Sequence, residues 1–239
     1  MQKTVTIQEQ KQYYDSLWNA RIRAKLCEDE LCRERFILQN VRAVIGKLGR
    51  RVKIIDLGCG RGWITSSLSR YGDVVGVDLS PGSAQKLYPN LRFIQANIAV
   101  DEVEGRYDVV VSSEVLEHMT PEDQRRYVEK ASRLLVDGGY LILTTPNSVV
   151  AKKLDAEPSK LQLIENWLEK GELESLLSAH FKVVYTGSAV FHPVFVRKHA
   201  LTEKMYGFLI FRSKAYRLVN KLLRGSNHGL YLTFVARKR

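Results

Sequence analysis

Several features common in other protein classes are scarce or missing in this sequence of 239 residues. No run of about eighteen apolar residues occurs, so we expect no transmembrane helix. Residues 1–18 are polar and lack the apolar core of a secretory signal. The three cysteines, Cys27, Cys32 and Cys59, are too few for a disulfide framework, and a lone C-x4-C spacing predicts no metal site. These absences favour a globular protein of the cytoplasm.

Acidic residues are scarce at the C-terminal end. Residues 195–239 contain eleven lysines and arginines against one acid, Glu203, so nearly all of the formal net charge of +11 lies there. Within them, 204–224 combines basic residues at helical spacing with an apolar opposite side. This segment could be a solvated helix, a lid for an anionic substrate, or a surface that rests on anionic lipid. Nucleic acid is a weaker explanation, because no RNA-binding signature accompanies the charge.

Short apolar runs alternate with amphipathic stretches along the rest of the chain, which predicts an α/β fold. Repeated β-α units with continuous apolar strands indicate a parallel sheet with helices on both faces. We expect VDGGY (136–140) to end a helix at its glycines and begin the next strand. The predicted strands are Val52–Leu57, Val74–Val77, Arg92–Gln95, Tyr107–Ser112, Tyr140–Thr144, Phe181–Val190 and Leu230–Ala236, and the main helices are Trp63–Tyr71, Pro121–Leu135 and one within Leu161–His180.

A glycine-rich turn, IIDLGCGRGWIT (54–65), joins the first strand to a helix. Asp78, at the end of the second strand, can accept hydrogen bonds from ribose hydroxyls, so the ligand has an adenosine-like half. A nicotinamide dinucleotide and S-adenosylmethionine both meet that description. The dinucleotide pattern fails because Trp63 replaces its last glycine. Asp56 would repel a pyrophosphate but attract an ammonium or sulfonium, and 107–119 supplies more acids, which favours S-adenosylmethionine.

Five segments between residues 50 and 147 resemble the class I S-adenosylmethionine-dependent methyltransferases in order and spacing. They are IIDLGCGRGWIT, VVGVDLS, FIQANI, YDVVVSSEVLEH and LLVDGGYLILTTPN. The EVLEH and TTPN forms look most like the ubiquinone-biosynthesis O-methyltransferases and related small-molecule enzymes. The resemblance implies a Rossmann-like seven-stranded, mostly parallel sheet with an antiparallel last strand and helices on both faces. It also implies S-adenosyl-L-methionine as cofactor, with S-adenosyl-L-homocysteine as product.

We expect one methyltransferase domain over 1–239. Its parts would be an N-terminal helical cap (1–50), a cofactor-binding core (51–190), a basic helical insertion or lid (191–229) and the last strand (230–239).

The resemblance also assigns roles to residues of the core. The methionine end of the cofactor would be contacted from the glycine turn and the fourth strand, the ribose by Asp78, and the adenine by Leu79. Asn97 falls where the family often has an acid that accepts from the adenine amino group, and an asparagine carbonyl can accept too. The full cofactor set is Asp56, Gly58, Cys59, Gly60, Trp63, Asp78, Leu79, Asn97, Ile98, Ser113 and Glu114.

The acceptor side has fewer signals. His118 is the candidate general base, with a helix-start residue that packs or caps as the competing explanation. The candidate substrate-binding residues are Tyr14, Trp18, His192 and Arg197, although Tyr14 and Trp18 could instead anchor the N-terminal helix. We expect methylation of a hydroxyl or acid oxygen on an anionic or amphipathic small molecule. N-methylation of an amine or amino sugar, and methylation of a prenylated or lipid acceptor at a membrane surface, remain open.

Overall fold

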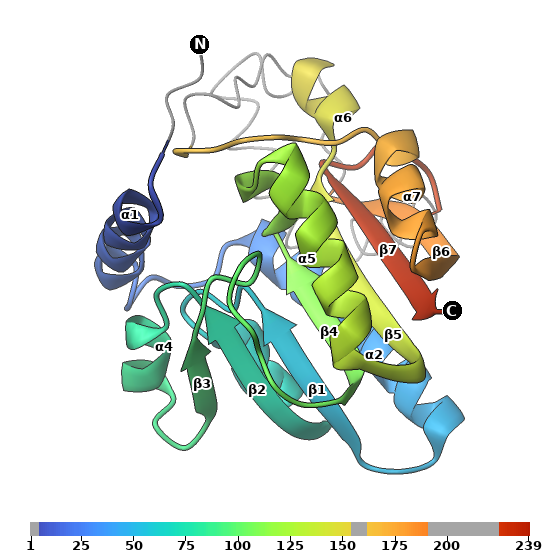
Figure 1. The fold of residues 1–239 in the computed structure, drawn as a ribbon, viewed down its shortest axis with the longest axis horizontal. Coiled ribbons are helices and arrows are strands. Elements are labelled where there is room, and N and C mark those ends of the chain that lie inside the picture. Colours follow the sequence, from blue (N-terminus) through green and yellow to red (C-terminus); the bar gives the residue numbers. More distant parts are fainter. Residues whose placement is uncertain (1–4, 154–161, 191–224) are drawn as a thin grey trace.

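The computed structural model describes residues 5–153, 162–190 and 225–239, and these form a sheet with helices on both sides (Figure 1). The strands of the sheet are β1 (Val52–Leu57), β2 (Gly72–Asp78), β3 (Arg92–Gln95), β4 (Tyr107–Ser113), β5 (Leu135–Pro146), β6 (Phe181–Ala189) and β7 (Tyr231–Lys238). The helices are α1 (Ile7–Ala20), α2 (Glu28–Leu48), α3 (Trp63–Leu68), α4 (Gly82–Leu87), η1 (Leu116–His118), α5 (Pro121–Leu134), α6 (Ser148–Lys153) and α7 (Lys170–Ser178).

The seven strands are ordered β3-β2-β1-β4-β5-β7-β6. Neighbouring strands from β3 to β5 are parallel, and β7 is antiparallel to both β5 and β6. Parallel neighbours bring their carboxyl ends to one edge of the sheet, where ligands of open α/β folds bind. The predicted sheet with an antiparallel last strand is confirmed.

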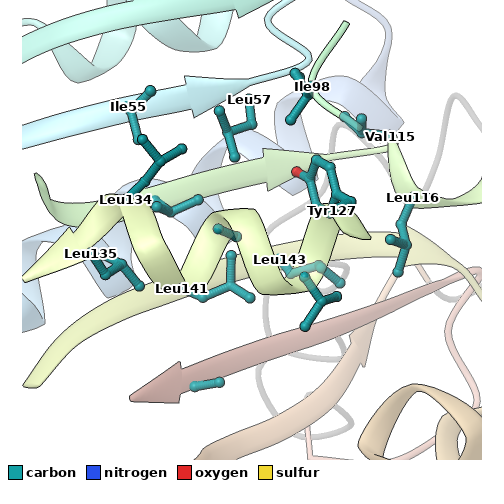
Figure 2. Packing of buried hydrophobic residues seen from close by; sticks show 14 of the residues in the cluster. Ile55, Leu57, Ile98, Val115, Leu116, Tyr127, Leu134, Leu135, Leu141 and Leu143 are labelled. Carbon is teal, nitrogen blue, oxygen red and sulfur yellow. The ribbon is translucent and has the colours of Figure 1, made fainter. Parts of the chain in front are cut away.

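Alternating side chains of β1 supply both hydrophobic cores. Ile54 faces the core that α2 and α3 cover, while Ile55 and Leu57 face the core under α5 and α7. Successive side chains of a strand point to opposite faces, so a run of apolar residues is needed when both faces are covered. Figure 2 shows Tyr127 of α5 among these side chains, and its hydroxyl donates to Ser112 Oγ at 2.6 Å.

The segment after α5 differs from the prediction. The helix ends at Leu134, and Leu135 already pairs with Tyr107 in the sheet. The register then shifts, so that Tyr140 is the next residue paired with β4, opposite Val109. Gly138 has a φ of 72°. Because Leu135 and Tyr140 both pair with β4, the glycines between them form a bulge inside β5 rather than a helix cap. A glycine in the left-handed region suits either structure, so the sequence pattern does not distinguish them.

Two hydrogen bonds hold the chain at the ends of the segment 191–229, which precedes β7. The amide of Leu230 donates to the carbonyl of Val190 at 2.9 Å. The buried Asn147 donates through Nδ2 to the carbonyl of Gly229 at 2.9 Å. Most of the predicted basic insertion lies outside the described residues, and the predicted domain boundaries stay predictions. Among the helices of the described residues, none is long and apolar enough to cross a membrane.

Candidate functional site

The glycine turn between β1 and α3 forms the floor of the site. Gly58, Gly60 and Gly62 have φ values of 76°, 52° and 79°, in the region that favours glycine. A Cβ on Gly58 would lie 2.3 Å from a methyl carbon of Val115, and one on Gly60 would lie 3.0 Å from the Trp18 ring. The turn is therefore compressed between the end of β4 and helix α1, with no room for a side chain at Gly58 and only a tight contact with Trp18 at Gly60.

Asp78 braces this turn from the end of β2. Its two carboxylate oxygens accept hydrogen bonds of 2.8 Å from the backbone amides of Gly60 and Ser80. Burial raises the pKa of Asp78 above its usual value. Asp56 lies in the same floor, accepts from Thr65 Oγ1 at 2.6 Å, and has its pKa raised by burial to about 7. Two carboxyls are thus held beside the turn, and within the described residues no cationic side chain is bonded to either.

A cavity of about 1140 Å³ opens above this floor, at the carboxyl ends of the strands. It brings together every predicted site residue that the structure describes. Its lining includes all eleven residues of the predicted cofactor set together with Tyr14, Trp18 and His118. His192 and Arg197 lie outside the described residues.

The polar side chains of the predicted cofactor set differ in how many of their hydrogen-bonding groups are already used within the protein. The Asn97 side-chain carbonyl already accepts from the Ala99 amide at 3.1 Å, so only its second lone pair remains for a ligand. Ser113 Oγ lies 3.0 Å from Thr144 Oγ1. Glu114 has a φ of 58°, which is rare for a residue other than glycine. Such a conformation turns the chain sharply at the end of β4, beside the cavity.

Arg33 of α2 is a residue of the site that sequence reasoning missed. Its guanidinium lies 3.7 Å from Glu114 Oε1 and 4.8 Å from the centre of the Tyr231 ring, and all three residues line the cavity. Arg33 Nε and Glu114 Oε1 are buried without a hydrogen-bond partner. Burial raises the pKa of Glu114 to about 8 despite this cation. The available signal was that Arg33 precedes the buried Phe36 by three residues, on the apolar side of its helix.

His118 lies in a second, acidic part of the cavity. Its Nδ1 is 3.2 Å from the carbonyl of Ile164 and 3.5 Å from Glu165 Oε1, and its Nε2 is 3.8 Å from Glu117 Oε1. Burial raises the pKa values of both glutamates, that of Glu117 to about 8. Thr145 Oγ1 donates to Glu117 Oε2 at 3.1 Å. The histidine is therefore held between two carboxyls at the end of β4.

The segment 162–169 forms this acidic wall, and its contribution could not be read from the sequence. The Asn166 amide donates to the carbonyl of Glu117 at 2.7 Å, and its side chain donates to the carbonyl of Met119 at 2.6 Å. Gln124 of α5 donates to the carbonyl of Asn166 at 3.1 Å. These bonds fix the segment to the loop after β4, so Glu165 reaches His118 from 47 positions away in the sequence.

Helix α1 covers the cavity from the side of the glycine turn. Trp18 lies against Gly60, and Tyr14 stacks near Trp18 with ring centres 6.4 Å apart. The Tyr14 hydroxyl donates to Gln162 Oε1 at 3.1 Å, and its ring lies 6.3 Å from that of His118. Both aromatics attach α1 and also line the cavity, and their predicted contact with the substrate stays a prediction.

The sheet order, the glycine turn and the cavity at the strand ends define a Rossmann-like methyltransferase fold. The chain belongs to the methyltransferase domain family, whose model matches residues 30–185. A curated relative, ubiquinone biosynthesis O-methyltransferase of Pectobacterium atrosepticum, is 31% identical over 124 residues, which cover 47% of this chain. That match spans about half of the relative, 48% of its length.

Two solved structures share the fold at low identity. Magnesium protoporphyrin IX methyltransferase of Synechocystis, with S-adenosylhomocysteine bound, superposes with a TM-score of 0.65 at 16% identity, covering 98% of this chain and all of the other. The 1,6-didemethyltoxoflavin-N1-methyltransferase of Burkholderia thailandensis gives a TM-score of 0.58 at 18% identity, covering 99% of this chain and 92% of the other.

Proposed function

We propose that the protein transfers a methyl group from S-adenosyl-L-methionine to a hydroxyl oxygen of a small amphipathic molecule. The observation that carries the proposal is one continuous cavity that joins the braced glycine turn to His118. The family membership and the named O-methyltransferase relatives support the same reaction.

The donor half of the cavity suits a cationic adenosyl compound. Asp78 would accept from the ribose hydroxyls, with Leu79 against the adenine and Asn97 at its amino group. The backbone of Gly58 and Gly60, whose positive φ values shape the turn and which lines the cavity, would contact the methionine end. Arg33 has an unpartnered Nε in this region and would hold the methionine carboxylate.

In the acceptor half, His118 is proposed to be the general base. The Ile164 carbonyl accepts a hydrogen bond from Nδ1, so a neutral ring carries its proton there and leaves Nε2 free to accept. The acceptor oxygen forms a bond to the methyl carbon while the carbon–sulfur bond breaks. The hydroxyl proton passes to Nε2, and the products are a methyl ether and S-adenosylhomocysteine.

Three exposed apolar side chains in the cavity lining support an acceptor with an apolar part. Ile7, Val100 and Leu163 line the cavity and yet remain 49%, 54% and 43% exposed. Exposed apolar side chains in the lining of a cavity favour contact with apolar surface of a ligand. An anionic acceptor group, and contact with an anionic membrane surface through 204–224, remain predictions that vesicle flotation and acceptor screening test.

Calorimetry with S-adenosylhomocysteine tests the donor site. We expect binding by the wild type and a loss of at least about tenfold in affinity for Asp78→Asn, because the carboxylate bond to the ribose and one of the amide bonds that brace the turn are lost. Asp73→Asn on the same strand is the control, since Asp73 pairs with Arg51 on the surface. A wild-type protein without measurable affinity would refute the proposal.

An acceptor screen that measures S-adenosylhomocysteine release tests the other half. With a hydroxyl acceptor, His118→Ala should lower kcat by about 10²- to 10⁴-fold while donor affinity stays unchanged. Equal kcat values for the two proteins would remove His118 from the reaction.

A second candidate is N-methylation of an amine, favoured by the acidic lining around His118. Glu117 and Glu165 could pair with a protonated amine and orient it. This function predicts turnover of amines but not of the matching alcohols, and Glu165→Gln should then raise KM for the amine. Turnover confined to hydroxyl compounds would exclude it.

A further inference from the structure

Helix α1 is attached to the rest of the protein by partly buried contacts outside the hydrophobic cores. None of its residues is buried. Ser80 Oγ donates to Asp15, and Ser83 Oγ donates to Asn19 Oδ1 at 3.2 Å. With Trp18 against the glycine turn, these contacts fix the helix beside α4, apart from both hydrophobic cores (Figure 1). A helix attached in this way can separate from the protein without exposing either core.

Arg61 adds a buried attachment at the end of α1. Its guanidinium donates to the carbonyls of Arg21 at 2.9 Å and Ala24 at 2.7 Å, and lies 3.2 Å from Glu30 Oε1. The residue is only 5% exposed. All three partners belong to the α1–α2 connection or the first turn of α2, so one side chain ties the glycine turn to the covering helix.

The position of Arg61 within the turn links this attachment to the donor site. Its backbone lies between Gly60 and Gly62, in the segment that faces the cavity, whereas its side-chain bonds go to the connection. If the connection moved away, the cation would lose two carbonyls and a carboxylate together. A buried arginine left without partners is strongly unfavourable, so these bonds favour the closed arrangement.

Resting on the proposed function, we infer that Arg61 is a positioning residue that holds α1 closed over the bound donor and slows the release of S-adenosylhomocysteine. The arginine acts through the α1–α2 connection and touches neither reacting group. Trp18 then keeps its place against Gly60, which encloses the donor half of the cavity.

Hydrogen exchange without any ligand tests the attachment itself. In Arg61→Gln, the amides of α1 should exchange at least about tenfold faster than in the wild type, while those of β4 keep their protection. The matched control is Arg51→Gln, which removes an arginine from an exposed ion pair at the far end of β1 and should leave α1 unchanged. Arg61→Lys should fall between the wild type and Arg61→Gln.

Stopped-flow measurement of S-adenosylhomocysteine release tests the consequence. The dissociation rate should rise about tenfold in Arg61→Gln, with an association rate within threefold of the wild type. Unchanged α1 exchange, or equally faster exchange in α1 and β4, would overturn the inference. If Arg61→Gln does not fold, the exchange rate of the α1 amides and the dissociation rate of S-adenosylhomocysteine are measured in Glu30→Gln instead. Absence of S-adenosylhomocysteine binding would refute the proposed function, whereas the exchange comparison would still decide the attachment.

Discussion

Replacing Gly58 by alanine tests how tightly Val115 packs against the glycine turn. The new Cβ would lie 2.3, 2.8 and 3.1 Å from three side-chain carbons of Val115, well inside contact distance. Adding one carbon to such a site costs about 1–3 kcal/mol. The φ of 76° adds about 1–2 kcal/mol for a residue with a Cβ. We therefore expect Gly58→Ala to lower the free energy of unfolding by about 2–5 kcal/mol.

Urea unfolding followed by circular dichroism measures this loss, and two further variants separate its parts. Gly46→Ala in α2 is the control, because its Cβ meets no atom within 4 Å, and it should leave stability unchanged or raise it by up to about 1 kcal/mol. In a Val115→Ala background, Gly58→Ala should cost about 1–3 kcal/mol less, since the two closest contacts are removed and only the backbone strain and the 3.1 Å contact with the Cβ of residue 115 remain. A cost below about 0.5 kcal/mol in the wild-type background would refute the reasoning.

Three further changes test other parts of the structure. Burial raises the pKa of Glu117 in the folded state to about 8. The contribution of this group to stability is therefore full below its pKa in the unfolded chain and is lost as pH rises through 8. Glu117→Gln should then flatten the fall of Tm between about pH 6 and 9. If differential scanning calorimetry gives the same change of Tm with pH for the wild type and Glu117→Gln, this role of Glu117 is refuted. Asn147→Ala should lower stability by about 1–3 kcal/mol in urea, because the Gly229 carbonyl loses its buried donor. Thr120→Ala should cost about 1 kcal/mol by removing the cap that accepts from the Asp123 amide, and an unchanged urea midpoint would contradict that role.

The parts of the fold that depend on local pattern could be predicted from the sequence. Val52–Leu57 and Arg92–Gln95 were predicted with the bounds that β1 and β3 have, because apolar runs ended by turn residues are local signals. The bulge in β5 could not be predicted, since its glycines suit a helix cap equally well and the pairing of Leu135 with Tyr107 decides between them.

In the candidate site too, local sequence patterns could be interpreted from the sequence, whereas tertiary contacts could not. Asp56, Asp78 and the glycines were identified from motif spacing, and all line one cavity. Arg33 and Glu165 were missed because each belongs to the site only through tertiary contacts, with Glu114 and with His118. Nothing in the residues around Glu165 indicates that its segment returns to the end of β4.

The paired ends of the segment 191–229 have a consequence for how this protein can diversify. Val190 and Leu230 are joined by a backbone hydrogen bond, and Asn147 holds Gly229, so the entry and exit of the intervening chain are set by the sheet. A replacement of residues 191–224 that leaves these bonds in place should therefore leave the register of β5, β6 and β7 unchanged.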